Sequence, residues 1–336
     1  MKNKISLSRK NITINKRLVL VDGFSGSGKS LICSIISHLK NAEQWQMDFK
    51  YENLAILNYF HKFSLKSAKA LCETGADENL YNLFIGRNVN FRNTDASSPL
   101  NNGMRAKYLN RLKDKDKKFA IKKIIKANPI LILHIHYIFG YSKFLMDVFS
   151  DSLKIYILVL RDPFHLIEHW YREYTSSLPG EKYPDFCPYI EIKNKLVPWY
   201  TKDYVNQYLK ANSFEKSILT IFELQKRIIQ MFDKLSYSEK KKMQIIFFDE
   251  FLNSPDKEIN SICKSLECNK SKKFNNTLKK ILSLSKKNKN NFRSINYEKF
   301  KKKYSKKISP KYKKMIIDLN KSYNEFNFRV KKIKMI

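Results

Sequence analysis

The sequence is poor in acidic residues: its 336 residues hold 31 Asp and Glu against 65 Lys and Arg. The formal charge is therefore +34, a field that favours polyanionic partners such as nucleotides, nucleic acid, anionic lipid or sulfated glycans. Lys, Asn and Ile are abundant along the whole chain, so compositional bias is the competing explanation of the charge.

Paired cysteines are also lacking. The chain has five cysteines, an odd number, and no two of them form a C-x-x-C pair. This argues against a zinc site and against a disulfide framework. We expect reduced thiols, no metal site and a cytoplasmic location.

Long apolar runs are missing as well. The first run, Leu18 to Val21, is short and stops at Asp22, which argues against a cleavable leader. The longest, Pro129 to Met146, is interrupted by polar residues and glycine, so we expect no membrane span. No repeat at a fixed period is present, and 43% hydrophobic residues predict a globular chain.

Short apolar runs alternate with longer segments of helical periodicity. We expect strands at about 17–21, 44–48, 130–135, 154–160 and 244–248, with helices between them. Continuous apolar runs are typical of strands that are buried on both faces of a parallel sheet. The pattern predicts an α/β fold with a mainly parallel central sheet flanked by helices.

The strongest motif follows the first strand. Gly23-Phe24-Ser25-Gly26-Ser27-Gly28-Lys29-Ser30 matches G-x-x-x-x-G-K-S and leads into a predicted helix, the context that a P-loop requires. Its backbone amides would wrap a phosphate, Lys29 would reach a terminal phosphate or sulfonate, and Ser30 could hold Mg²⁺. The predicted nucleotide-binding residues here are Gly23, Ser25, Gly26, Ser27, Gly28, Lys29 and Ser30.

The P-loop defines the expected domain organisation. Residues 1–15 form a basic lead-in, and residues 16–270 form the P-loop domain. Helical insertions are expected at about 49–128 and 171–243, the second with an irregular stretch at 178–200. Residues 271–336 form a basic C-terminal helical element that packs on the same domain.

Further polar residues follow the other predicted strands. Arg161 could clamp a phosphate at the end of its strand, or could form a loop salt bridge. Asp249-Glu250 resembles a Walker B pair that orients Mg²⁺, or caps a helix. Asp48 is a candidate base for an acceptor hydroxyl, with a turn or cap role as the alternative.

Histidines supply the other candidate bases. His134 and His136 alternate on one predicted strand; we expect their side chains to point to opposite faces and only one to face the site. Either could act near neutral pH, or be a packed core histidine. Glu168 or His169, two helical turns beyond Arg161, could return to the same cleft or lie on a solvated helix face.

The C-terminal region concentrates the positive charge. Residues 270–336 hold 23 Lys or Arg and only three Asp or Glu. This tail could bind a polyanion such as nucleic acid or membrane, or it could be a solvated element packed on the domain.

Taken in order, these motifs resemble those of the sulfotransferase superfamily. Ser27 to Leu31 is similar to the family's S-G-T-T-L segment, and Pro129 to His134 to its strand that ends near a histidine. Lys154 to Pro163 is similar to the strand before the nucleotide 3′-phosphate site. Phe248 to Pro255 resembles the late Y-E-D-L-x-x-x-P segment, and Ser309-Pro310 with the following helix resembles the closing element.

The resemblance implies the sulfonyl donor 3′-phosphoadenosine 5′-phosphosulfate. Gly28, Lys29 and Ser30 would hold its 5′-phosphosulfate, and Arg161 would clamp the 3′-phosphate. A histidine such as His134 would take the acceptor proton, with Lys29 on the bridging oxygen. Arg293, in a basic loop before the last helix, would also reach the nucleotide.

Three positions depart from the family pattern. Gly26 stands where the family usually has Lys or Arg, Lys29 replaces its Thr, and His169 replaces the Ser that contacts the 3′-phosphate. A sulfotransferase-like enzyme acting on a hydroxyl or amine is the first hypothesis. A Mg-ATP-dependent kinase of a small molecule or sugar, with Asp48 as base, is the second. The third is a non-catalytic nucleotide-binding protein whose basic tail docks on a polyanion.

Overall fold

A computed structural model describes residues 7–9, 13–101, 103–113, 119–175, 186–272, 274–287 and 297–333. Its centre is a five-stranded sheet in the order β2-β3-β1-β4-β7, and every pair of neighbouring strands is parallel. The strands are β1 (Leu18–Gly23), β2 (Gln46–Met47), β3 (Leu131–His134), β4 (Leu153–Leu160) and β7 (Met243–Phe247). The predicted α/β fold with a mainly parallel sheet is confirmed.

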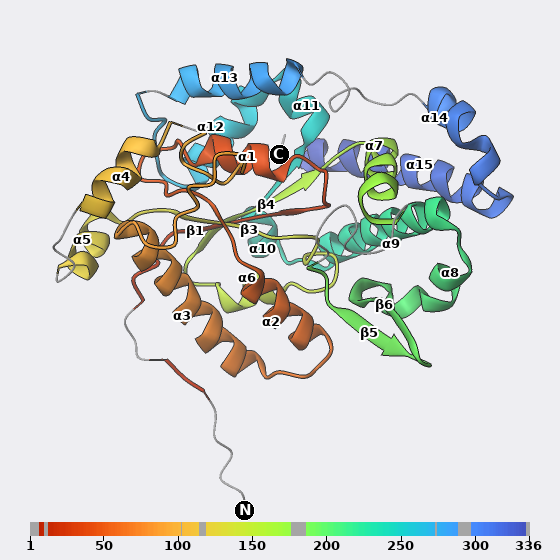
Figure 1. Ribbon diagram of the computed structural model, residues 1–336, viewed down its shortest axis with the longest axis horizontal. Coiled ribbons are helices and arrows are strands. Elements are labelled where there is room, and N and C mark those ends of the chain that lie inside the picture. Colours follow the sequence, from red (N-terminus) through yellow and green to blue (C-terminus); the bar gives the residue numbers. More distant parts are fainter. Residues whose placement is uncertain are drawn as a thin grey trace, which may run out of the picture.

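Helices cover both faces of this sheet (Figure 1). The first half of the chain contributes α1 (Lys29–Ile36), α2 (Phe49–Tyr59), α3 (Leu65–Phe84), α4 (Arg105–Lys113), α5 (Ala120–Ala127), α6 (Phe144–Val148) and α7 (Pro163–Trp170). The second half contributes α8 (Val205–Lys210), α9 (Ser213–Lys234), α10 (Tyr237–Lys241), α11 (Phe248–Asn253), α12 (Pro255–Ser265), α13 (Phe274–Lys287), α14 (Tyr297–Tyr304) and α15 (Pro310–Ile333). No helix within these described ranges is both long enough and apolar enough to span a membrane.

The two faces of the sheet have separate cores. Along β1, Val19 and Val21 join the cluster under α1, α11, α12 and α13, while Leu18 and Leu20 join the cluster on the other face of the sheet. All four side chains are fully buried, because successive residues of a strand point to opposite faces and both faces are covered. This explains why the strand sequences are continuously apolar.

The second insertion contains a small β element. β5 (Tyr189–Ile192) and β6 (Lys195–Pro198) form an antiparallel hairpin, and Lys193 and Asn194 at its turn both have positive φ, 51° and 61°. This is the backbone of a tight two-residue hairpin turn. The prediction of an irregular stretch over 178–200 is therefore wrong for 189–198, because proline near a strand end does not prevent edge pairing.

The C-terminal helices lie against the sheet-covering helices. In α15, the Leu319 carbonyl and the Ser322 hydroxyl accept hydrogen bonds from Nε2 of Gln225 in α9, at 3.0 and 2.8 Å. The rings of Phe232 and Phe326 pack edge to face with centroids 5.3 Å apart. In Figure 1, α14 and α15 lie beside α7 and α9.

Candidate nucleotide site

The loop after β1 lies at the carboxyl edge of the central strand, where parallel sheets bind ligands. Gly26 and Gly28 have φ of 85° and 97°, and neither has room for a side chain. A Cβ at Gly26 would lie 2.4 Å from Cδ2 of His169, and one at Gly28 would lie 2.2 Å from Cε2 of Phe248. The glycines therefore let α7 and α11 approach the loop from two sides.

Lys29 opens α1 and folds back over the loop. Its Nζ donates hydrogen bonds to the carbonyl oxygens of Gly23 (2.8 Å) and Phe24 (2.7 Å). Burial disfavours the ammonium and lowers the pKa of Lys29 to about 8, although the nearby carboxyl groups of Asp22 and Glu52 oppose this shift. A phosphate or sulfonate oxygen is a stronger partner for this ammonium than a neutral carbonyl.

Asp22, the residue before the loop, is fully buried. Its carboxylate accepts hydrogen bonds from the amides of Gly23 (2.6 Å) and Phe139 (2.8 Å) and from the Tyr156 hydroxyl (2.7 Å). Burial nevertheless raises the pKa of Asp22. This carboxyl group anchors the start of the loop to the end of β3 and to β4.

α7 covers the first half of the loop. Nε1 of Trp170 donates to the carbonyl of Ser25 (3.1 Å), and the Ser25 hydroxyl lies 2.6 Å from the hydroxyl of Tyr174, in the π-helix Tyr171–Thr175 that continues α7. His169 lies against Gly26, and burial lowers the pKa of His169 to about 4. The His169 ring is therefore neutral at physiological pH.

Arg161 reaches the same loop from the end of β4. Its Nη1 donates to the carbonyl of Gly26 (2.9 Å), and its guanidinium lies over the Phe248 ring, 5.0 Å from the centroid. Burial lowers the pKa of Arg161 to about 10. Arg161 is thus a second buried cation directed at the loop.

The Asp249–Glu250 pair has partners in the protein, and Oδ1 of Asp249 lies 3.9 Å from Nε of Arg161. Oδ2 of Asp249 accepts the backbone amide of Asp162 at 3.1 Å, which steadies the turn that carries Arg161. Asp162 in turn caps α7 by accepting the His165 amide. Glu250 forms an ion pair with Lys331 at 2.6 Å. The geometry matches a supporting role more closely than that of a Walker B pair.

The two histidines after β3 lie together, contrary to the expectation that they point to opposite faces. β3 ends at His134, and the chain then bends, with the Tyr137 amide donating to the carbonyl of Gly23 and Tyr137 at φ 42°. The ring centroids of His134 and His136 are 4.7 Å apart. The expectation was wrong because residues two apart along an extended chain point to the same face, and the amides of Ile135 and Tyr137 continue the hydrogen bonding to β1.

His134 lies beside the loop. Its Nε2 is 3.5 Å from the Ser30 hydroxyl, and Trp45 packs on the ring at 5.2 Å. Its Nδ1 is buried, and the described residues provide no hydrogen-bond partner for it. Burial and the charge of Lys29 lower the pKa of His134 well below its ordinary value.

His136 has a carboxyl partner that the sequence did not indicate. Its Nδ1 lies 2.9 Å from Oε1 of Glu52 in α2, and Phe49 of the same helix stacks on its ring. Burial raises the pKa of Glu52 to about 8 and lowers the pKa of His136 well below its ordinary value. The one local signal was an acid on a helix face that also carries Tyr51, Ala55 and Ile56, all buried.

Asp48 lies one helical turn before Glu52, at the end of β2. Its side chain caps α2 by accepting the Lys50 amide at 3.1 Å, and it also contacts Nζ of Lys50 (2.9 Å) and Nδ2 of Asn79 (3.0 Å). Arg293, which the family resemblance placed near the nucleotide, lies outside the described residues.

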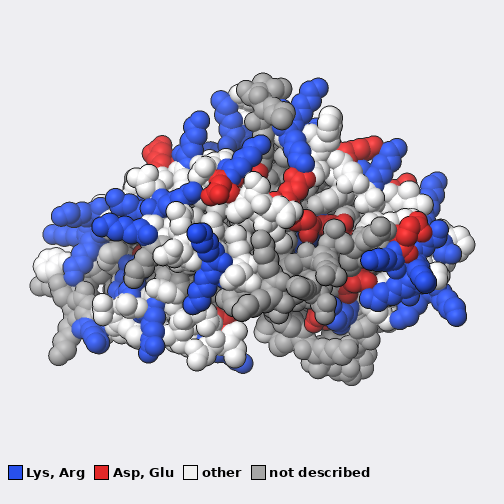
Figure 2. All heavy atoms as spheres, turned by 90° about the horizontal axis from the view of Figure 1, so that it is seen from above, with Lys and Arg blue, Asp and Glu red and all other residues white. Residues whose placement is uncertain are grey.

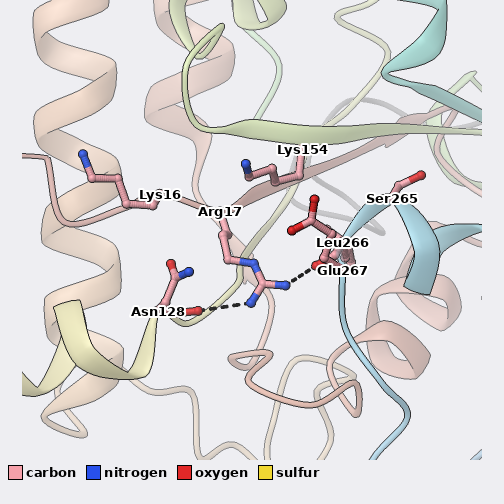
Figure 3. A pocket seen from close by; sticks show the side chains of 7 residues that line it. All are labelled: Lys16, Arg17, Asn128, Lys154, Ser265, Leu266 and Glu267. Atoms are coloured by element: carbon pink, nitrogen blue, oxygen red, sulfur yellow. Dashed lines mark hydrogen bonds between the residues drawn. The ribbon is translucent and has the colours of Figure 1, made fainter.

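A different cavity lies at the opposite, amino edge of the sheet. It measures about 210 Å³ and is lined by Lys16, Arg17, Asn128, Lys154 and residues 265–267. Arg17 spans it, donating to the Asn128 carbonyl at 3.3 Å and to the Leu266 carbonyl (Figure 3). Arg17 therefore joins the ends of α5 and α12 and does not project freely into the cavity.

Comparison with known proteins returned structural matches alone. No protein-family model matches the sequence, and no curated protein matches it. Among the solved structures, a sulfotransferase domain from the curacin biosynthetic pathway is 10% identical, with TM-score 0.39, covering 80% of this chain and 77% of that one. A sulfotransferase domain of the Synechococcus PCC 7002 olefin synthase is 11% identical, with TM-score 0.43, covering 96% and 98%.

A third structure, sulfotransferase STF9 from Mycobacterium avium, is 9% identical, with TM-score 0.39, covering 88% of this chain and 76% of that one. All three are sulfotransferases, the superfamily that the sequence motifs resemble.

Proposed function

We propose that this chain is a sulfotransferase-like enzyme that transfers a sulfonyl group from 3′-phosphoadenosine 5′-phosphosulfate to a hydroxyl or amine. The observation that carries the proposal is the Glu52–His136 pair, which stands at the carboxyl edge of the sheet beside His134, Ser30 and Lys29. A carboxyl-oriented imidazole next to a phosphate-binding loop is the arrangement that acceptor deprotonation requires.

The residues around the loop suit a donor with two anionic ends. Gly28, Lys29 and Ser30 would hold the 5′-phosphosulfate. The hydroxyl of buried Ser27, which has no hydrogen-bond partner among the described residues, offers a further hydrogen bond. Arg161 and His169 approach Gly26 from the other side and would hold the 3′-phosphate. The donor supplies an activated sulfonyl group, and the protein contributes position and positive charge.

We assign the proton acceptor to His136 in preference to His134. His136 has the Glu52 carboxyl on Nδ1, and its side chain is 19% exposed, while His134 is 4% exposed and faces Ser30. The acceptor oxygen would attack sulfur as the bond from sulfur to the 5′-phosphate oxygen breaks. The acceptor proton would pass to His136, leaving a sulfate ester and 3′-phosphoadenosine 5′-phosphate.

The kinase alternative rests on the intact Gly28-Lys29-Ser30 sequence. It requires Mg²⁺ beside Ser30, but the side chain found there is the imidazole of His134. Asp22 and Asp249 accept backbone amides, and Asp48, its proposed base, is engaged by Lys50 and Asn79. These contacts favour the sulfonyl donor over Mg-ATP.

Thermal-shift titration of the purified protein tests the donor. It compares 3′-phosphoadenosine 5′-phosphate, 5′-AMP and ATP, each with and without Mg²⁺. A ligand at about 100 times its dissociation constant adds roughly 2.7 kcal/mol of stability. We expect the 3′-phosphorylated nucleotide to stabilise without metal and the other two to have little effect; stabilisation by Mg-ATP alone would reject the proposal.

Arg161→Ala separates recognition of the 3′-phosphate from general charge. We expect it to weaken binding of 3′-phosphoadenosine 5′-phosphate by about 2–5 kcal/mol, since a buried charged hydrogen-bond partner is removed, and to leave 5′-AMP binding nearly unchanged. Arg92→Ala, an exposed arginine paired with Asp95, serves as the control. Equal losses for both nucleotides would place the 3′-phosphate elsewhere. Binding without sulfonyl transfer to any acceptor would support the non-catalytic alternative.

A further inference from the structure

The segment 299–314, here called the lysine strip, is anchored by a buried ladder. Phe300, Tyr304, Ile308, Tyr312 and Ile316 recur every four residues through α14, the 3₁₀ turn Ser305–Lys307 and the start of α15, and all are buried. The Tyr304 ring stacks on Phe214 of α9 with centroids 4.2 Å apart. Because one side of the segment is buried, its remaining side chains face solvent.

Those remaining side chains are almost all cationic. The strip contains nine lysines and no acidic residue or arginine. Three of these lysines have neighbouring partners: Glu168 for Lys303, the Tyr171 hydroxyl for Lys307 and Gln207 for Lys311. The other six form no ion pair with any described residue; they are Lys299, Lys301, Lys302, Lys306, Lys313 and Lys314.

The strip borders the helix that covers the nucleotide loop. Lys303 contacts Glu168 of α7 at 3.1 Å, and the next two residues of α7 touch the loop, His169 at Gly26 and Trp170 at the Ser25 carbonyl. In Figure 1, α14 lies next to α7, and Figure 2 shows Lys and Arg side chains at this end of the molecule as well as at the opposite end. A polymer bound along the strip would therefore lie close to the proposed donor site.

The composition of the strip favours recognition by charge alone. Its aromatic side chains Phe300, Tyr304 and Tyr312 are buried, so none is available to stack on the bases of a single-stranded nucleic acid. The strip contains no arginine that could bind a phosphate group through two parallel hydrogen bonds. No large apolar side chain of the strip is exposed for insertion into a lipid surface.

We propose that the lysine strip binds an acidic polysaccharide, whose sulfate or carboxylate groups meet these point charges and whose hydroxyls supply the acceptor. This inference rests on the proposed sulfonyl transfer for the role of the hydroxyls. Each transfer adds one negative charge to the polymer, so the product would bind the strip more tightly than the unmodified chain.

Binding of three fluorescent probes at several salt concentrations tests the proposal: a heparin oligosaccharide, a short DNA duplex and vesicles that contain phosphatidylserine. The strip variant is Lys302→Gln, Lys306→Gln and Lys314→Gln. The matched control is Lys66→Gln, Lys234→Gln and Lys264→Gln, which removes three exposed lysines elsewhere, so that both variants have the same net charge. Thermal shift with 3′-phosphoadenosine 5′-phosphate is measured on all three proteins.

We expect the strip variant to bind heparin at least about tenfold more weakly and with a lower salt slope, since each lost contact removes roughly 0.7–0.9 of that slope. The control should change little, and all three proteins should bind the nucleotide alike. Equal losses in both variants would attribute binding to diffuse charge and overturn the proposal.

If the duplex or the vesicles bind more tightly than heparin, and this binding depends on the strip, the polysaccharide proposal is overturned in favour of that partner. If the parent protein binds heparin through the strip but does not bind the nucleotide, the proposed function fails and the acceptor role fails with it. The strip would then remain a polysaccharide-binding surface without a role in sulfonyl transfer.

Discussion

Two opposite edges of the same sheet use a cation in the same way and differ in what surrounds it. At the carboxyl edge, Lys29 donates to the carbonyls of Gly23 and Phe24. At the amino edge, Arg17 donates to the carbonyls of Asn128 and Leu266. Lys29 folds back on its own loop and Arg17 joins two distant segments, and we propose a ligand for the first alone.

The difference follows from helix direction. α1 begins at Lys29, so its free amides and the positive end of its dipole face the carboxyl edge. α5 and α12 end at the amino edge, where their last carbonyls attract a cation. The same donor group therefore marks an anion site at one edge and a structural cross-link at the other.

The largest effect that sharpens this comparison is expected from Lys29→Met. Removing a buried ammonium that contacts the ligand should cost about 2–5 kcal/mol of nucleotide binding. Folding stability should change less, because the two lost carbonyl hydrogen bonds are offset by removal of a buried ammonium whose desolvation lowers the pKa of Lys29 to about 8. Thermal shift with and without 3′-phosphoadenosine 5′-phosphate measures both quantities, and unchanged nucleotide stabilisation would contradict the assigned role.

Arg17→Met should give the reverse pattern with a smaller effect. We expect a loss of about 1–3 kcal/mol in the free energy of unfolding, since two carbonyls lose a charged donor, and unchanged nucleotide affinity. Lys154→Met, in the same cavity but without an ion pair or hydrogen bond from its side chain to any described residue, should stay within about 0.5 kcal/mol of the parent. Urea denaturation measures these free energies of unfolding. Equal losses in the two variants would show that Arg17 is not a structural cross-link.

A third expected effect, measured per pH unit, is a change in the pH dependence of stability in Glu52→Gln. The pKa of Glu52 is raised from 4.5 to about 8, so the folded parent holds an extra proton in that window. The contribution of Glu52 to stability is therefore present below pH 4.5 and is lost as the pH rises toward 8, with a slope of at most about 1.4 kcal/mol per pH unit.

Unfolding free energies of parent and Glu52→Gln across this window measure the difference. The variant should lose less stability than the parent as the pH rises. Lys29, Asp48 and His136 face the same carboxyl group and remain in both proteins, so their own contributions largely cancel. Parallel curves would show that the pKa of Glu52 is not raised by its surroundings.

Several features were predictable because they depend on local sequence. The run from Leu18 to Val21, the glycine turn and the apolar helix after it determine a strand, a loop and a helix in order. The strand before Arg161 was predictable from its apolar sequence in the same way. The pairing of His136 with Glu52 was not, because 84 residues separate them and α2 must first pack beside the end of β3.

The histidine prediction was wrong about the faces of the strand. Residues two apart along an extended chain point to the same face, so alternation itself places His134 and His136 side by side. The amides of Ile135 and Tyr137 continue the hydrogen bonding to β1, so the chain stays extended as far as His136. The periodicity of residues 130–136 was therefore sufficient to place both imidazoles on one side of the sheet.

Sequence alone determined the parallel α/β plan, the phosphate-type loop and the concentration of positive charge in the last quarter of the chain. Hydrophobic periodicity, glycine and net charge act over a few residues or by simple addition, so they can be read without coordinates. Tertiary structure decided which imidazole has a carboxyl partner, which cation faces the loop and which lysines remain unpaired. These depend on burial and on contacts between distant segments, which form only when the helices pack on the sheet.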